Sequence, residues 1–381
     1  MQDAKFDNAL TAWRYRPGVR ALLATAGLLV LAGSALAGRP TAHTLRKSQG
    51  DPIAAVAQDK NVAAWLTSGS RPCNEVHVMS PGKKDRTLPQ SPSDSMTCRW
   101  SLADGQPQLA VAVRMSTALW TLHETNPSSF DQVVVAAFAG PERQLERFTH
   151  ATNGTGEWLG GVAGAGRTLA YSWVDVEYVD PVACLSGGSC KEKIADGGIQ
   201  IVTRQGTKYT YAPLPDAKPA LQLAAAAGRI AYIPAVTAKS GRPSANTNGS
   251  LYVVDAVSGD PVAQASVHGI PIAIALSSRV LAVLTTQNGP RDRISWFSAT
   301  DGTKLGSVLV SAQAAPQLAA SDRLLVYRVG RRLRGVATRN GHIKTLTKTG
   351  LNYVGLSLSR KRLVWGENHG NNGRLRALST G

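Results

Sequence analysis

The feature that most constrains how this chain folds is a two-part segment pattern that recurs along it. Each copy joins a run of small apolar residues, a tight polar turn, and a second run that ends in bulkier apolar or aromatic residues. Apolar residues at a period of two on both sides of turn formers are typical of β-hairpins. The pattern occurs seven times, at residues 53–66, 109–122, 160–173, 221–233, 272–284, 318–328 and 354–365.

Further strand-like segments complete a larger unit after each hairpin. A third run follows every copy, at residues 75–79, 132–137, 199–203, 251–255, 294–298, 333–338 and 375–378. Turns such as Asp301-Gly302 and Asn340-Gly341, whose glycines tolerate positive φ, then lead into a fourth run. Repeated four-strand units predict an all-β, seven-bladed β-propeller over residues 53–381, with six or eight blades as alternatives.

Composition and residue size agree with this fold. With 43% hydrophobic but only 6% aromatic residues, 37 Gly and 20 Pro, the chain fits neither a disordered protein nor an all-helical bundle. The first strands carry small residues, as expected where blades converge on a central channel. The second strands carry aromatic rings, which suit the wider space between neighbouring blades.

The last repeat has no fourth strand of its own, because the sequence stops where other third strands end. An open sheet edge leaves backbone groups unpaired and needs a cover. Residues 41–47 (TAHTLRK) alternate in character ahead of the first repeat. We therefore expect residues 38–52 to supply the closing strand of the last blade, and the alternative is a disordered stalk.

The N-terminal 37 residues have the parts of an export signal. Arg14, Arg16 and Arg20 precede an uninterrupted apolar or small stretch, residues 21–37, that ends in Ala-Leu-Ala. This pattern predicts a cleaved signal peptide. The stretch also reaches the lower limit of a membrane span, so an uncleaved signal anchor is the alternative. In both cases the rest of the chain is secreted or extracytoplasmic.

The four cysteines, Cys73, Cys98, Cys184 and Cys190, all follow this segment. An even number of cysteines in an oxidising compartment favours disulfides over metal ligation. Sequence proximity favours pairing Cys184 with Cys190 and Cys73 with Cys98. The second pair is the less secure of the two, because the simplest hairpin register does not place its cysteines opposite each other.

The second-strand segments resemble the repeat of TolB-type and WD-repeat-like propellers. The resemblance lies in a polar turn, a basic residue and an apolar pair, with Ser278-Arg279 and Asp322-Arg323 at the turn where the TolB-type repeat has Pro-Asp-Gly-Lys. The stretch LYVVDAVSGDP at 251–261 is similar to a repeat of pyrroloquinoline-quinone-type propellers, without their docking Trp. These resemblances imply a divergent secreted propeller, and they name no ligand.

Two groups of residues are candidate binding sites. The longest expected loop, residues 174–197, carries Asp175, Glu177, Tyr178 and Asp180, whose oxygens could hold a cation such as calcium or simply be solvated. The second group is a set of cations at the turn before each second strand, which would circle the channel and attract phosphate or carboxylate groups, or serve only the turns themselves. Its aligned members are Arg167, Arg229, Arg279, Arg323 and Arg362, with Lys60 and Arg114 nearby.

Charge gives the clearest indication of a partner. The whole chain carries a net charge of +17, and residues 321–381 alone hold 13 Lys and Arg against two acids, so the last two blades should form a positive sector. We expect an envelope protein or an anionic envelope polymer or lipid as partner, rather than nucleic acid outside the cell.

Motifs of known enzymes are missing from the sequence, including the Gly-x-Ser-x-Gly elbow and the His-Glu-x-x-His helix. The expected function is therefore a monomeric binding or interaction module of the cell envelope, with no resident cofactor or metal. The rival is a propeller enzyme, a quinoprotein dehydrogenase or a hydrolase acting at the channel mouth. His123, Glu124, Asp175 and Glu177 would be its first candidate residues.

Overall fold

The computed structural model describes residues 41–68, 75–88, 108–125, 129–137, 142–151, 155–185, 190–237, 243–245, 248–286, 289–312, 317–350 and 352–380. All of them belong to one compact unit, residues 41–381. The expected signal or anchor at 1–37 lies outside the described residues. Within the described ranges, no helix has both the length and the apolar character that a membrane crossing requires.

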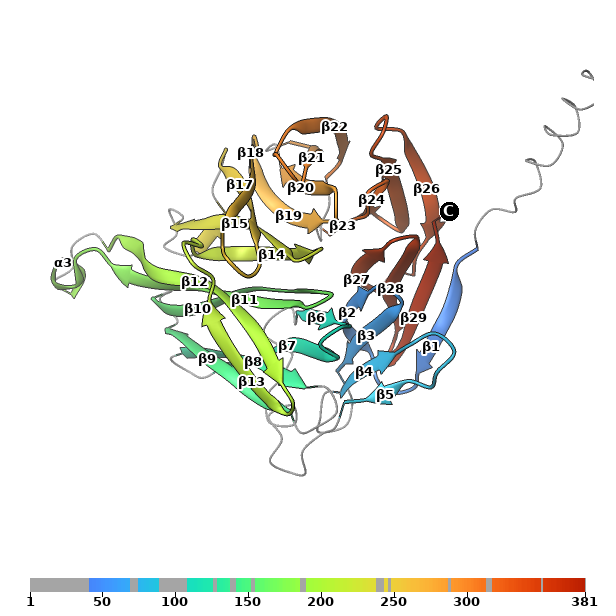
Figure 1. Cartoon of the computed structure of the whole chain (residues 1–381), viewed down its shortest axis with the longest axis horizontal. Helices are drawn as coiled ribbons and strands as arrows, with labels where there is room; N and C mark the ends of the chain where they lie inside the picture. Colours follow the sequence, from blue (N-terminus) through green and yellow to red (C-terminus); the bar gives the residue numbers. More distant parts are fainter. Residues whose placement is uncertain are drawn as a thin grey trace, which may run out of the picture. The chain divides into compact units, whose positions relative to one another are not determined.

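Three sheets follow one plan, in which four antiparallel strands pair in chain order (Figure 1). The strands are β2 (Ile53–Asp59), β3 (Val62–Thr67), β4 (Glu75–Met79) and β5 (Arg86–Thr87); β19 (Ile270–Leu276), β20 (Val280–Thr286), β21 (Arg291–Ser298) and β22 (Lys304–Ser311); and β23 (Leu318–Ala320), β24 (Leu324–Val329), β25 (Arg332–Ala337) and β26 (Ile343–Lys348). Their sequences alternate as strands must: in β25, buried Leu333 stands between Arg332 and Arg334.

A fourth sheet keeps the same order and adds a short strand at one end. It consists of β14 (Ala220–Ala226), β15 (Arg229–Thr237), β17 (Ser250–Asp255) and β18 (Pro261–Ser266), with β16 (Pro243–Ala245) paired to β15. The turns that link third to fourth strands use glycine as expected. Gly302 and Gly341 take φ values of +77° and +70°, and a Cβ at Gly302 would clash with the carbonyl oxygen of Gln264.

The fifth sheet has eight strands, in two groups of four. They are β6 (Leu109–Ala112), β7 (Thr117–Thr125), β8 (Ser129–Ala137) and β9 (Arg143–Ala151), then β10 (Gly156–Ala165), β11 (Thr168–Tyr178), β12 (Glu192–Gln205) and β13 (Lys208–Pro213). Each group repeats the hairpin order of the other sheets. The groups meet at a single residue pair, His150 opposite Gly156.

The sixth sheet joins the two ends of the described chain. It pairs β27 (Asn352–Ser359), β28 (Arg362–His369) and β29 (Asn372–Ser379) in order, and β1 (His43–Ser48) lies antiparallel along the outer side of β29. The ladder runs from His43 opposite Ala377 to Ser48 opposite Gly373. The N-terminal segment thus supplies the outermost strand of the sheet formed by the C-terminal segment.

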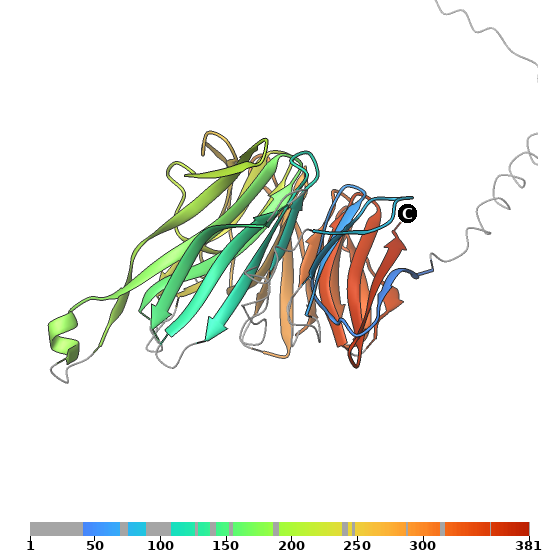
Figure 2. The same ribbon diagram turned by 90° about the horizontal axis from the view of Figure 1, so that it is seen from below.

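The first strand of each group lies next to the first strand of the following group. The order of contact is β2, β6, β10, β14, β19, β23 and β27, and β27 in turn contacts β2. Figure 2 shows the strands from the side, running from one end of the molecule to the other. This arrangement makes the protein an all-β β-propeller.

Large aromatic side chains fill the space between neighbouring sheets, as the sequence predicts. Trp65, Trp120, Tyr171, Tyr327 and Trp365 all lie on second strands and are fully buried. Each buries a large apolar area between sheet faces, where small residues would leave cavities. These large buried aromatic residues therefore mark second strands, as the repeat predicts.

Candidate functional site

A central cavity of about 710 Å³ is lined by all of the innermost strands. Small and apolar side chains such as Ala54, Val162, Leu223, Ile274 and Leu356 form most of its wall. A second cavity of about 220 Å³ continues between the same strands toward the turns that precede the second strands. The described lining residues of both cavities include no carboxylate, so this wall offers little to a charged group.

We name the end of the molecule that bears the turns between first and second strands the turn face, and the opposite end the loop face. The aligned cations Arg167, Arg229, Arg279, Arg323 and Arg362, with Lys60 and Arg114, all lie at the turn face, in or directly after the turn of their own hairpin. The structure thus places the seven positions at one end of the molecule.

Several of these cations are engaged with the next sheet. The Arg229 Nη1 donates to the carbonyl oxygen of Ala299 at 3.1 Å, and the Arg362 Nη1 donates to that of Asn61 at 2.8 Å. The backbone N–H of Arg279 donates to Asp322 at 2.9 Å. The side chains of Arg167 and Arg323 are exposed and make no hydrogen bond or ion pair with the described residues, although the Arg323 carbonyl oxygen accepts from the Thr338 N–H at 3.1 Å. The regular position therefore serves contacts between sheets in at least part of the ring.

Carboxylates at the turn face bridge the hairpins in the same way, a role that sequence analysis did not predict. Asp59, which is 7% exposed, accepts hydrogen bonds from the N–H groups of Val113 at 2.9 Å and Gly166 at 2.6 Å, which belong to two other hairpins. Asp322 accepts from the Ser278 hydroxyl at 2.7 Å. A buried carboxylate that accepts two backbone donors holds three turns in register.

The turn face also carries a small basic pocket of about 440 Å³ that sequence analysis did not identify. Arg114 and Arg167 line it together with Arg204 from the end of β12. Arg204 itself donates to the carbonyl oxygens of Gly206 at 2.7 Å and Met115 at 3.0 Å. Its guanidinium is thus already committed to the backbone, as those of Arg229 and Arg362 are.

The acidic residues expected on a long loop lie mostly on a strand. Asp175, Glu177 and Tyr178 belong to β11, which pairs with β12 as far as Tyr178 opposite Glu192, and Asp180 follows. Buried Val174 and Val176 alternate with the acids, which is a strand period rather than a loop pattern. The carboxylates therefore project from a hairpin that extends well beyond the neighbouring strands (Figure 1).

The carboxylates of this hairpin affect each other. Burial, with Glu177 and Asp196 nearby, raises the pKa of Asp175. Burial, with Asp175 and Glu146 nearby, raises the pKa of Glu157, which lies opposite Asp175 in the ladder. Over the described residues, no group of three or more His, Cys, Asp or Glu side chains is arranged to hold a metal ion.

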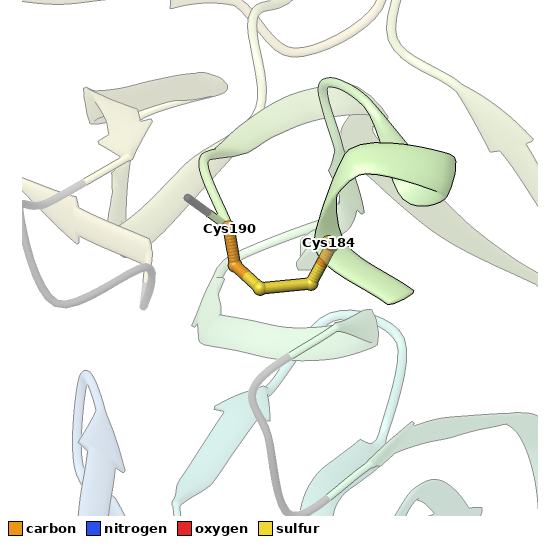
Figure 3. The surroundings of a disulfide bond; sticks show 2 residues. All are labelled: Cys184 and Cys190. Atoms are coloured by element: carbon orange, nitrogen blue, oxygen red, sulfur yellow. A yellow bond between two sulfur atoms is a disulfide. The ribbon is translucent and has the colours of Figure 1, made fainter. Parts of the chain in front are cut away.

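The tip of the same hairpin carries the expected disulfide. Cys184, in the short helix α3 (Pro181–Leu185), is bonded to Cys190 (Figure 3). This pairing confirms the prediction from sequence proximity. The expected pair of Cys73 and Cys98 lies outside the described residues. Val179 and Val182, beside the disulfide, are 57% and 75% exposed.

The residues considered for an enzyme do not meet at the channel. His123 lies on β7 and its Nδ1 is 3.1 Å from Gln132 Nε2, within the sheet. Asp175 and Glu177 lie on the β11 hairpin, and the side chain of Glu124 is not among those described. None of the three described side chains lines the central cavity.

Comparison with known proteins identifies no family for this chain. No protein-family model matches the chain, and no curated protein does. Among solved structures, BamB from Moraxella catarrhalis is 11% identical with a TM-score of 0.41, over 85% of this chain and 82% of that one. The Dos1 propeller is 10% identical with a TM-score of 0.44, over 90% and 95%. The Pan2 WD40 domain of Neurospora crassa is 8% identical with a TM-score of 0.42, over 90% and 96%. Such likenesses concern the fold alone.

Proposed function

We propose that this protein is an extracytoplasmic interaction module of the cell envelope that binds an anionic surface, with no resident cofactor. The observation that carries the proposal is the unbalanced charge of the β23–β26 and β27–β29 sheets. Residues 321–381 hold 13 Lys and Arg, and their two acids are Asp322 and Glu367. Such a sector attracts anionic surfaces through the summed field of its charges.

Both acids of the sector are occupied by contacts inside the protein. Asp322 accepts from Ser278 and from the backbone of Arg279 at the turn face. Glu367 accepts from the Trp365 indole N–H at 2.8 Å. The exposed cations Arg331, Arg332, Arg339, Lys344 and Arg374 have no ion pair with either acid. Their charge is therefore available to a partner.

The test of this function is retention on vesicles at rising salt. We expect the full-length protein to bind phosphatidylcholine vesicles that contain phosphatidylglycerol, and to be released as ionic strength increases, because salt screens exposed charges. The triple variant Arg339→Glu/Lys344→Glu/Arg374→Glu should lose most of this binding. Its control, Arg143→Glu/Lys193→Glu/Lys208→Glu, makes the same charge change at exposed sites outside the sector.

Two outcomes would overturn the proposal. Binding that ignores salt between low and physiological ionic strength would remove its electrostatic basis. Equal losses in the two triple variants would show that net charge matters and that the sector does not. If the vesicles fail to bind while an acidic envelope protein is captured from extract, the partner is of a different class.

The finer form of the fold belongs to the same proposal: a divergent TolB-type or WD-repeat-like propeller with seven blades in a closed ring. The eight-stranded sheet counts as two blades because one residue pair, His150 with Gly156, joins its halves. The pairing of β1 with β29 and the contact of β27 with β2 support closure. Deleting residues 43–48 should lower the thermal unfolding midpoint by several degrees, because β29 then becomes an open edge.

The proposed location follows from the N-terminal pattern and the disulfide. Disulfides persist in oxidising compartments outside the cytoplasm. Mass spectrometry of the native protein should find Cys184 joined to Cys190, with a chain that starts after Ala37 or remains whole in the membrane fraction. Recovery of the protein from cytoplasm with reduced thiols would contradict export.

A further inference from the structure

We propose that the β23–β26 sheet carries a binding site for a phosphate group, at the loop-face end where β24 turns into β25. The site names the ligand chemistry of the positive sector, so it rests on the function proposed above. It consists of Arg331, Arg332, Arg334 and Lys348 with the hydroxyl side chains of Ser311 and Thr349. These residues line a cavity of about 680 Å³, and its described lining includes no carboxylate.

The cations of this pocket are gathered by strand register. The turn at Gly330, which has a φ of +54°, brings Arg332 back along β24, and Arg332 lies directly opposite Lys348 of β26. Arg334 lies opposite Tyr327 of β24. Burial raises the pKa of Tyr327 and the guanidinium of Arg334 offsets part of that rise, so the two groups are neighbours.

Gathering these four cations in one pocket lowers the stability of the fold unless an anion neutralises them. Like charges directly opposite each other on paired strands repel. Within the described part of the chain, none of the four cations forms an ion pair. Nearby Arg328 differs, because its Nε donates to the Gly330 carbonyl oxygen at 2.7 Å and its guanidinium lies 4.6 Å from the centre of the Tyr353 ring. Among the pocket cations, Arg334 lies beside Tyr327, whereas the side chains of Arg331, Arg332 and Lys348 have no such contact with the described residues.

A buried hydroxyl at the same place also lacks a partner. Thr349 is 5% exposed and its backbone N–H donates to the Arg331 carbonyl oxygen at 2.8 Å. Its Oγ1 has no hydrogen-bond partner among the described residues. Buried hydroxyl groups are normally satisfied, and an exception calls for an explanation. The Oγ1 atom itself is inaccessible, so the Thr349 side chain must rotate before its hydroxyl can meet a ligand oxygen in the pocket.

Phosphate is the chemistry that fits these groups best. A guanidinium binds two oxygens of one phosphate in parallel, and several arginines with an ammonium match a group of two negative charges. A carboxylate offers one charge and two oxygens to four cations. The cavity falls within the size range of small-molecule sites, which leaves room for whatever bears the phosphate. The ligand class is therefore a phosphomonoester or the phosphate of a lipid headgroup.

The experiment uses the full-length protein, with binding measured by calorimetry against glycerol 3-phosphate and, separately, by flotation with phosphatidylcholine vesicles containing phosphatidic acid. We expect Arg331→Glu/Arg332→Glu to weaken binding of the responsible probe by about tenfold or more, the effect of losing one charge-assisted contact. The matched control Arg339→Glu/Lys344→Glu changes the same charge in the same sheet, at exposed positions outside the pocket. It should change glycerol 3-phosphate binding by less than about twofold, because its charges are distant and screened. Arg339 and Lys344 belong to the positive sector, so this control lowers retention on all anionic vesicles, whereas the pocket variant should also lose the preference for phosphatidic acid over phosphatidylglycerol vesicles.

Thr349→Val provides a second test that does not alter charge. It should weaken binding several-fold and leave the unfolding midpoint unchanged or higher, since the hydroxyl it removes has no internal partner. Binding to glycerol 3-phosphate identifies a free phosphomonoester as the source, and binding only to the vesicles identifies a headgroup.

The proposal is overturned if neither probe binds, if sulfate competes as well as glycerol 3-phosphate does, or if the pocket variant and its control lose equal amounts of glycerol 3-phosphate binding and of the preference for phosphatidic acid. In the last case vesicle retention would still depend on the sector. The proposed function would then stand without the site. If neither variant loses vesicle binding, the proposed function itself is overturned.

Discussion

Two sets of cations in this molecule have opposite relations to the fold. The cations at the turn face recur in every hairpin. The guanidinium groups of Arg229 and Arg362 donate to carbonyl oxygens of the next sheet. The cations of the β24–β25 pocket occur in one sheet, and Arg332 faces Lys348 without a neutralising acid. The comparison indicates that several of the repeated charges serve assembly, whereas the charges of the pocket, which break the repeat, are the ones that we propose for a ligand.

The same distinction holds for acidic side chains. Asp59 and Asp322 lie in hairpin turns and accept backbone N–H groups from neighbouring hairpins. Asp175 and Glu177 lie on the extended β11 hairpin, where burial and the neighbouring Glu177 raise the pKa of Asp175. The predictions below separate these structural charges from the ligand-binding ones.

The largest effect on stability should come from Asp59→Ala. Two partly buried N–H groups, those of Val113 and Gly166, would lose their acceptor. We expect a loss of about 2 kcal/mol in the free energy of unfolding, measured by urea denaturation. Asp260→Ala, at an exposed turn position, is the control and should change stability by less than about 0.5 kcal/mol. Equal effects would mean that Asp59 does not hold the turns together.

The contrast between the two sets of cations is tested by measuring both stability and phosphate binding in one variant of each set. Arg362→Met should lower the free energy of unfolding by about 1 kcal/mol, because the hydrogen bond to Asn61 is lost. It should leave phosphate binding unchanged. Arg331→Glu/Arg332→Glu should do the reverse: phosphate binding is lost, and the unfolding midpoint stays the same or rises, because an acid then faces Lys348. If Arg362→Met abolishes phosphate binding instead, the cations of the turn face form a ligand site, and the contrast between the two sets of cations is wrong.

The sequence predicts the strands well because each one carries its own local signal. The third strand expected at residues 75–79 is found as β4 (Glu75–Met79), and the segment at 41–47 is found as β1 (His43–Ser48). Alternation and turn residues are local properties. The loop expected at residues 174–197 is wrong, because the chain there forms the β11–β12 hairpin, and the spacing of Val174 and Val176 already has the period of a strand.

The sites could not be predicted in the same way, because they depend on pairing between segments. The turn position of Arg362 follows from the repeat, but its acceptor at Asn61 lies 301 residues away. Arg332 meets Lys348 only because β25 and β26 adopt a particular register, with an irregularity between Leu333 and Arg334. Counting charges along the sequence predicts the positive sector, whereas the pocket depends on the register of the strands.

A third network of structural charges should show itself through pH. His77 is 14% exposed and its Nε2 lies 3.3 Å from Glu75, while Arg46 of β1 pairs with Asp85 at 3.1 Å. Burial lowers the pKa of His77 below its ordinary value of 6.5, although Glu75 and Asp85 partly oppose this. As pH falls below 6.5, the unfolded chain gains a proton before the folded one does, so stability falls until the lower pKa of the folded state is passed.

The variant His77→Gln removes this titration. Thermal unfolding measured across the same pH range should then lose the part of its slope that lies below pH 6.5, with no change above it. A slope that persists in the variant would assign the pH dependence to other groups.

The smallest effect is expected at the β11 hairpin and has the opposite sign. Burial and the neighbouring carboxylates raise the pKa of Asp175 above its ordinary value of 3.8. Over the interval between the two values, the folded state holds a proton that the unfolded chain has released, so stability decreases as pH rises through it. Asp175→Asn should remove this loss and make the protein slightly more stable at neutral pH, as measured by its unfolding midpoint. A variant less stable at neutral pH would show that the Asp175 carboxylate has a favourable contact in the fold, and unpaired charge would then no longer distinguish ligand-binding from structural regions.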